Sequence, residues 1–161
     1  MGELLKVVHA LLGVLFIAGL IGRWITLSEA ARATEIPGMR TLLNLSGRFE
    51  RIVIVTPTLV LVLGVATAIA QGRPFLGPLQ GAPIDWLFVS LLVFLSPLPL
   101  VPLVFLSRGR VFEAALDEAT AKGEVTERLR AEFRDPVVRA AHVYELAATV
   151  AVLILMISKP F

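Results

Sequence analysis

Residues 52–72 read IVIVTPTLVLVLGVATAIAQG and carry no charged side chain. An α-helix needs about 20 mainly apolar residues to cross the roughly 30 Å hydrocarbon core of a bilayer, because each residue adds about 1.5 Å. The uncharged run is long enough for one crossing. It therefore predicts a membrane-spanning helix over about residues 49–70.

The composition of the whole chain points the same way. Of its 161 residues, 57% are hydrophobic, and the 12 glycines raise the apolar share to about 64%. Soluble globular domains have roughly 45–50%, so a water-soluble domain is excluded. Intrinsic disorder is excluded as well, because it requires low hydrophobicity and a high net charge, whereas the net charge here is +2.

Charge pattern and cysteine content exclude further classes. In the longest polar stretch, acidic and basic residues alternate, so no basic surface for nucleic acid is expected. The chain has no cysteine, which excludes disulfides, thiolate metal sites and cysteine nucleophiles. The expected surroundings are a lipid bilayer, without a nucleic-acid partner.

Three further apolar stretches predict spans over about residues 4–27, 84–106 and 137–158. The uncharged run that follows Glu145 is too short to cross, so the last span must begin near Val137 and include His142 and Glu145. We therefore expect an all-α fold, a polytopic four-transmembrane-helix bundle. It forms a single integral membrane domain over residues 1–161.

The distribution of Lys and Arg predicts how the chain is oriented in the membrane. Of the 15 Lys and Arg residues, 12 lie in or beside the two long connections, and cytoplasmic loops are the ones rich in Lys and Arg. The other three are Lys6, Arg73 and Lys159, on the opposite side. Both termini should therefore lie outside a bacterial cytoplasmic (inner) membrane. The first span is expected to stay uncleaved, since Glu3 lies in its leading region and its trailing flank is basic.

The second long connection and the third span contain residues that start, break or bend helices. Residues 108–135 predict a cytoplasmic helical pair broken at Gly123, with a mainly solvated charged face. Asp135 and Pro136 then predict a helix start, because Asp is a good N-cap and Pro suits the first helical position. In the third span, three prolines between residues 97 and 102 predict a kink or local unwinding.

Ionisable groups within the last span form a candidate inner site. His142 and Glu145 share one face of the helix with Thr149 and Met156, and such a polar stripe must face other helices. Together with Glu50, His142 and Glu145 are candidate metal ligands. The favoured alternative is ion pairing of the two carboxylates with the arginines expected at the same level, which are Arg23, Arg48, Arg51 and Arg139.

His9 is the second candidate site. It lies in the outer part of the first span, at the level expected for Met156, whereas His142 is about 15 Å deeper at about 1.5 Å per residue. A haem held by His9 and Met156, or by His9 alone, is geometrically allowed. Gly13, one turn beyond His9, leaves room for a flat ring. The alternative is that His9 forms a hydrogen bond near Lys6 and that Met156 only packs.

Two motifs carry a family resemblance. Lys6-x-x-His9, followed by Ala18-Gly19-Leu20, resembles the first helix of the HemJ-type protoporphyrinogen oxidases, and the ending Lys159-Pro160-Phe161 is similar to that of their last helix. Those proteins have four spans, an outward N-terminus and a b-type haem. The resemblance implies that His9 is a haem ligand and that Glu145 corresponds to their buried glutamate.

The third span departs from that pattern. Where those oxidases have a His and a Lys, this chain has Phe88 and Ser90, so the base that proton abstraction requires is missing. We therefore do not expect an enzyme of that kind. With Gly22-Arg23-Trp24, the sequence is similar to a bacterial family of predicted four-span membrane proteins of unknown function. That family is distantly related to HemJ and to copper-resistance protein D.

Three functions follow as hypotheses. The first is a haem-binding redox or porphyrin-handling membrane protein that uses His9. The second is a non-enzymatic accessory or assembly protein that binds a membrane-complex partner, or a second copy of itself, through residues 111–133. The third is a metal or solute permease that uses the break between Pro97 and Pro102.

Overall fold

The computed structural model describes residues 2–160, and these residues contain helices and loops but no strand. The four longer helices are α1 (Gly2–Arg32), α2 (Ile36–Ala70), α4 (Leu106–Lys122) and α6 (Pro136–Ser158). The shorter ones are η1 (Gly77–Gln80), α3 (Trp86–Leu95), the π-helical turn η2 (Val101–Phe105) and α5 (Glu127–Phe133). The all-α expectation is confirmed.

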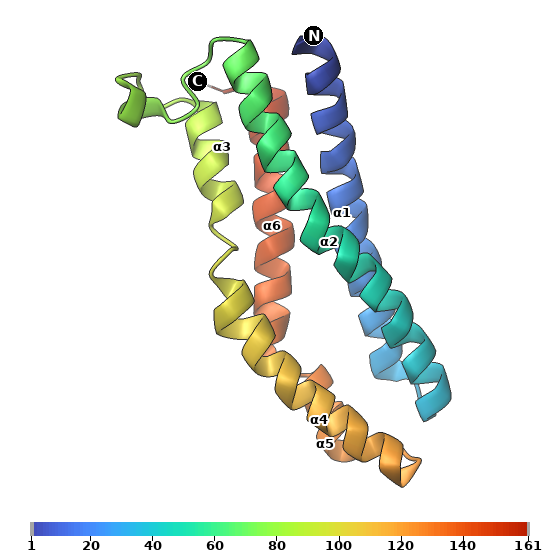
Figure 1. The fold of residues 1–161 in the computed structure, drawn as a ribbon. Helices are drawn as coiled ribbons and strands as arrows, with labels where there is room; N and C mark the ends of the chain where they lie inside the picture. Colours follow the sequence, from blue (N-terminus) through green and yellow to red (C-terminus); the bar gives the residue numbers. More distant parts are fainter. Residues whose placement is uncertain (1, 161) are drawn as a thin grey trace.

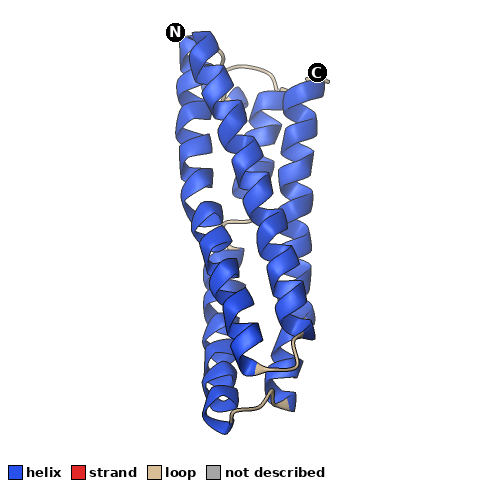
Figure 2. Ribbon diagram, turned by 90° about the vertical axis from the view of Figure 1, so that its right-hand side faces the viewer, coloured by secondary structure: helices blue, strands red, loops and turns tan. Residues whose placement is uncertain are grey.

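The helices run side by side in an elongated bundle (Figure 2). α1 and α2 form a long hairpin, and α3 packs beside α6 (Figure 1). Both ends of the chain lie at one end of the bundle, and the α4–α5 hairpin lies at the other (Figure 1). A chain that crosses a membrane an even number of times has both ends on the same side, and this arrangement is compatible with that.

Apolar side chains face outward along the long helices. Leu11 on α1, Val62 on α2 and Ile154 on α6 are each more than half exposed. Exposed apolar surface on this scale would be unstable in water and marks a surface that faces lipid. α1, α2 and the segment Glu127–Ser158 are each long and apolar enough to cross a membrane.

The segment predicted to form the third span differs from the other three. Its α-helical part, α3, has 10 residues, which at about 1.5 Å each cover about half of a bilayer core. The span predicted over residues 84–106 is thus interrupted, and three helices rather than four satisfy the criteria for a span within residues 2–160. A fourth crossing stays a prediction.

Prolines cause this interruption. Pro97, Pro99 and Pro102 have no N–H to donate to the carbonyl four residues earlier, so the α-helical bonding ends at Leu95. The chain continues through tighter turns, in which the N–H of Leu100 donates to the Pro97 carbonyl at 2.9 Å, and then through η2. The predicted unwinding is confirmed.

One side-chain contact ties the interruption to α6. The hydroxyl of Tyr144 donates to Ser96 Oγ at 2.7 Å, and Ser96 donates in turn to the Val93 carbonyl at 2.7 Å. The pair supplies polar partners where the regular backbone bonding of α3 ends.

The first long connection is not a loop. Only three residues separate α1 from α2, so both helices extend beyond the predicted spans. They do so because Ala30, Ile36 and Met39 bury their side chains against Ala119 and Leu129 of the α4–α5 hairpin. The predicted spans over residues 4–27 and 49–70 therefore lie within longer helices.

The predicted signals between α4 and α6 are confirmed. Gly123 ends α4 with a φ of 71°, a left-handed conformation that suits glycine. The Asp135 carboxylate accepts from the backbone N–H groups of Val137 and Val138 at the start of α6, with Pro136 in the first turn. The helical pair differs from the prediction in one respect, since its first helix begins at Leu106.

Candidate functional site

A cavity of about 480 Å³ lies between α1, α2, α3 and α6, in the half of the bundle that holds both termini. This volume falls within the roughly 300–1,000 Å³ of typical small-molecule and cofactor pockets. Its walls are mostly aliphatic and aromatic. Phe16 of α1 and Phe94 of α3 meet edge to face across it, with ring centroids 6.5 Å apart.

His9 lines the cavity, and a hydrogen bond to α2 fixes the position of its ring. Its Nδ1 atom lies 2.9 Å from the carbonyl oxygen of Val60 on α2. A carbonyl oxygen only accepts hydrogen bonds, so Nδ1 must carry the proton. In the neutral imidazole, Nε2 then has the free lone pair. A fixed Nδ1–H to carbonyl bond is the usual support of a histidine that binds a metal through its other nitrogen.

Two glycines make room around this histidine. A Cβ atom at Gly64 of α2 would lie 2.9 Å from His9 Cε1, so the imidazole packs directly against the α2 backbone. Gly13, one turn after His9, also lines the cavity. Met156 of α6 lines it as well, so the structure brings His9 and Met156 to one cavity.

The two positions that depart from the HemJ pattern have ordinary structural roles. Ser90 is buried and lines the cavity, but its hydroxyl donates to the Trp86 carbonyl at 2.6 Å within α3. Phe88 packs against Gly77 of η1. Neither side chain is a base.

The inner candidate site is an ion-pair cluster centred on Arg23. The guanidinium is buried and donates to Glu50 of α2 at 2.8 Å and to Glu145 of α6. It also lies 5.8 Å from the centre of the Phe105 ring, which stacks on His142 at 4.9 Å. One cation thereby joins α1, α2 and α6.

His142 has two alternative partners in this cluster. Its Nδ1 lies 3.1 Å from an Arg23 nitrogen and 3.4 Å from a Glu145 oxygen. Arg23 can only donate and an ionised Glu145 can only accept, so one contact requires an unprotonated Nδ1 and the other a protonated one.

This geometry agrees with the ion-pair interpretation of the inner site. Arg23 occupies the position between Glu50 and Glu145 that a metal ion would need. Within residues 2–160, no group of three or more His, Asp or Glu side chains could hold a metal ion. Arg48, Arg51 and Arg139, the other arginines expected at this level, are exposed.

The sequence did not indicate the basic rim of the cavity. Three basic residues line the cavity, and we call them the basic rim: Lys6, Arg73 and Lys159. In the sequence they stand out only as the basic residues that lie away from the two long connections. Their juxtaposition depends on loop geometry after α2 and α6, which local patterns do not show.

The fold and the cavity define the class of the protein: an all-helical integral membrane protein with a largely apolar cavity at one end of its bundle. A family model described as "Predicted integral membrane protein (DUF2269)" matches residues 3–160, and the chain belongs to this family. The comparison establishes this membership and not a relationship to HemJ or to copper-resistance protein D. Neither a curated protein nor a solved structure matches the chain.

Proposed function

We propose that this protein crosses the bacterial cytoplasmic membrane four times and binds a b-type haem in its outer cavity, with His9 as a ligand. The observation that supports this most is the 2.9 Å contact between His9 Nδ1 and the Val60 carbonyl. It fixes the imidazole and leaves Nε2 with the lone pair that iron binds.

The residues of the cavity fit a haem. Its walls are apolar, His9 supplies one axial nitrogen, and Met156 supplies a thioether on the same cavity. Histidine–methionine and single-histidine ligation both occur in haem proteins. A bound haem would supply one-electron redox chemistry.

Each wall residue has a definite role in this proposal. Val60 orients the His9 ring, and Gly64 lets that ring approach the α2 backbone. Phe16 and Phe94 keep water from the ring of the ligand. The Ser90 hydroxyl already donates within its own helix and is given no role as a base, so the proposed role is haem-dependent electron transfer or porphyrin handling without HemJ-type oxidase activity.

The proposed topology places the cavity toward the outside. Both termini lie at the cavity end, and the α4–α5 hairpin lies at the opposite end in the cytoplasm (Figure 1). This orientation follows from the excess of arginine at the hairpin end. The interrupted segment from α3 through η2 forms the third crossing.

The two alternative functions have less support. The apolar face of the α4–α5 hairpin, including Phe112, Ala115 and Leu129, packs on the ends of α1 and α2, so it is already occupied within the chain. On α3, the cavity lining ends at Phe94, one turn before the prolines. A permeation path through the proline break has no link to that cavity.

An absorbance spectrum tests the proposal. Protein purified in mild detergent from cells supplied with haem should show a Soret band, which His9→Ala should abolish. His142→Ala removes the same side chain from a position outside the cavity and should keep the band. Haem-supplied wild-type protein without a Soret band, or an unchanged spectrum in His9→Ala, would refute the haem proposal.

A further inference from the structure

Three cationic side chains from three separate segments line the cavity. Lys6 comes from the first turns of α1, Arg73 from the connection after α2, and Lys159 from the residue that ends α6. The remainder of the lining is mostly apolar. The cavity is therefore amphipathic, with positive charge at one end.

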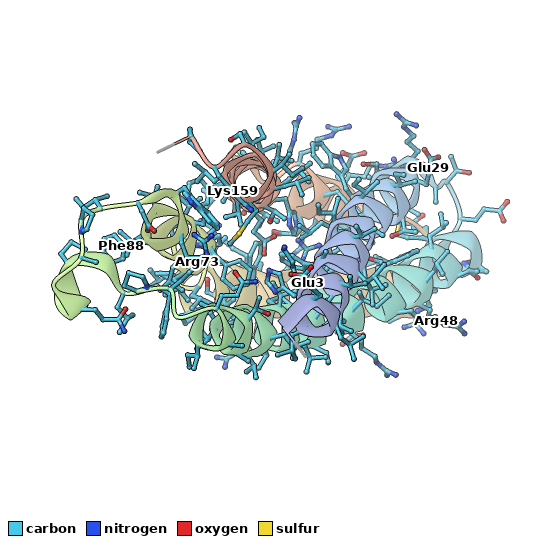
Figure 3. The ribbon with its side chains drawn as sticks, turned by 90° about the horizontal axis from the view of Figure 1, so that it is seen from above. Glu3, Glu29, Arg48, Arg73, Phe88 and Lys159 are labelled. Carbon is cyan, nitrogen blue, oxygen red and sulfur yellow. The ribbon has the colours of Figure 1, made fainter. Side chains whose placement is uncertain are left out.

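Arg73 and Lys159 share one aromatic platform. The Arg73 guanidinium carbon lies 5.6 Å and the Lys159 Nζ atom 5.5 Å from the centre of the Trp86 ring. Both distances are within the range of cation–π contacts. In Figure 3, seen from the end that holds both termini, the two residues lie close together between α3 and α6.

Within the part of the chain that the structure describes, these two cations have no carboxylate partner. Among the side chains of residues 2–160, no carboxylate lies within 4.0 Å of Arg73 or Lys159. With the described residues, the Arg73 side chain forms one hydrogen bond, a 3.3 Å contact from Nε to Gln71 Oε1. Two like charges are thus held together beside an apolar cavity, an arrangement that favours an anion.

Backbone geometry places both residues at the rim. After α2, Gly72 adopts a φ of 65°, and the N–H groups of Gly72 and Arg73 donate to the carbonyls of Ile69 and Ala68. This Schellman motif turns Arg73 back over the end of the helix. Lys159 has a φ of 43°, the one positive φ of a non-glycine residue within residues 2–160. Such a conformation is costly and concentrates at functional sites.

We propose that Lys6, Arg73 and Lys159 form a carboxylate-binding rim, which holds the acidic end of an amphipathic ligand while its apolar body occupies the cavity. The inference deepens the proposed function, on which it rests for the position of the ligand. A tetrapyrrole with two propionates and a long-chain fatty acid share this chemistry. Lys6 also pairs with Glu3 at 3.5 Å, so Arg73 and Lys159 carry most of the selectivity.

The test compares an acid with its neutral ester. The probes are metal-free protoporphyrin IX and its dimethyl ester, which share one ring and lack iron. They are titrated into the full-length Trp24→Phe protein in nanodiscs of zwitterionic lipid, so that quenching of Trp86 reports binding. The diacid should bind roughly tenfold more tightly than the diester, as expected for two partly exposed charge pairs.

Two double variants test which residues cause the preference for the diacid. Arg73→Gln combined with Lys159→Gln should bind diacid and diester equally. Arg48→Gln combined with Arg51→Gln removes the same number of charges from exposed positions outside the cavity and should keep the preference. Should the rim variant fail to fold, 0.5 M salt applied to the otherwise unchanged protein should reduce the preference by screening.

Competitors distinguish the two sources of carboxylate. Displacement of the porphyrin by palmitate but not by methyl palmitate would assign the rim to acyl carboxylates. Resistance to both, with the diacid preference intact, would assign it to a tetrapyrrole. If the protein shows a Soret band but binds diacid and diester equally, the carboxylate-binding rim is refuted and the haem proposal stands. A diacid preference without a Soret band would overturn the haem proposal alone.

Discussion

Arg23 on α1 and Glu50 on α2 are joined by a 2.8 Å ion pair, and the same guanidinium donates to Glu145 on α6. The Arg23 side chain is 6% exposed, Glu145 13% and Glu50 44%. Arg23 is therefore a buried cation that pairs with two carboxylates, of which Glu145 is the more buried. Removing the cation leaves the more buried carboxylate uncompensated.

We expect Arg23→Met to lower the free energy of unfolding by roughly 3–5 kcal/mol, the range for breaking a buried pair by removal of one partner. Glu50→Gln should cost much less, because this carboxylate is half-exposed and water already screens it. Thermal unfolding in detergent compares the variants. Equal melting temperatures for Arg23→Met and the wild type would contradict the central role of this cluster.

Gly64→Ala should disturb the cavity without unfolding the bundle. The added Cβ would lie 2.9 Å from His9 Cε1, so the ring must rotate away from the Val60 carbonyl. Haem occupancy, measured as the ratio of Soret to protein absorbance, should fall severalfold. Gly47→Ala, on the same helix with open space around the new Cβ, should keep occupancy and stabilise the helix by about 0.5–1 kcal/mol.

Leu129→Ala should show how much the α4–α5 hairpin depends on its contact with α1 and α2. Leu129 is fully buried in the cluster that includes Ala30 and Met39. Truncation of a buried leucine costs about 2–5 kcal/mol. Leu103→Ala removes the same atoms from a side chain that is 73% exposed. Proteolysis of the hairpin should therefore accelerate in the first variant and remain unchanged in the second.

The stability of the α4–α5 hairpin should depend on pH. Hydrogen bonds from Lys122 and then Arg128 hold the pKa of Glu118 below its ordinary value of 4.5. Since the folded pKa is the lower one, the stabilisation is present above about pH 4.5 and is lost as the pH falls through the folded value. The difference in melting temperature between wild type and Glu118→Gln should accordingly shrink between pH 6 and pH 3. A difference that grows on acidification would contradict this pairing.

The absence of cysteine from the sequence makes the proposed topology directly testable. Gln80→Cys lies in η1 at the cavity end, and Lys122→Cys lies at the end of α4. A membrane-impermeant maleimide added to intact cells should label the first variant at once and the second only after lysis. Labelling of Lys122→Cys in intact cells would reverse the orientation.

Local sequence patterns were sufficient for much of the fold. Long apolar stretches predict α1, α2 and α6, and the breaks at Gly123 and at the prolines follow from residues that cannot continue a helix. The extension of α1 and α2 beyond the membrane was missed. Arginines such as Arg40 suggested a loop, whereas Ile36 and Met39 find burial against a hairpin some 80 residues later in the chain.

The candidate site was predictable only in part. An ionisable residue in an apolar run identifies His9 and Glu145 as candidates. Their partners lie on other helices, so the bond of His9 to Val60 and the choice of Arg23 over Arg48 depend on how the helices pair. The positions of Arg73 and Lys159 depend on left-handed turns, which no periodicity reveals.

The turns at Pro97–Pro99 divide the segment from α3 to α4 into an outer rod, which is α3, and an inner rod, which is η2 with α4. The outer rod carries Trp86, Ser90 and Phe94 of the cavity wall, while the inner one continues into the hairpin. A bend of the hairpin is therefore not transmitted along a stiff helix to the cavity. Within the bundle, α3 is instead held by its packing on α6 and by the hydrogen bond from Tyr144 to Ser96.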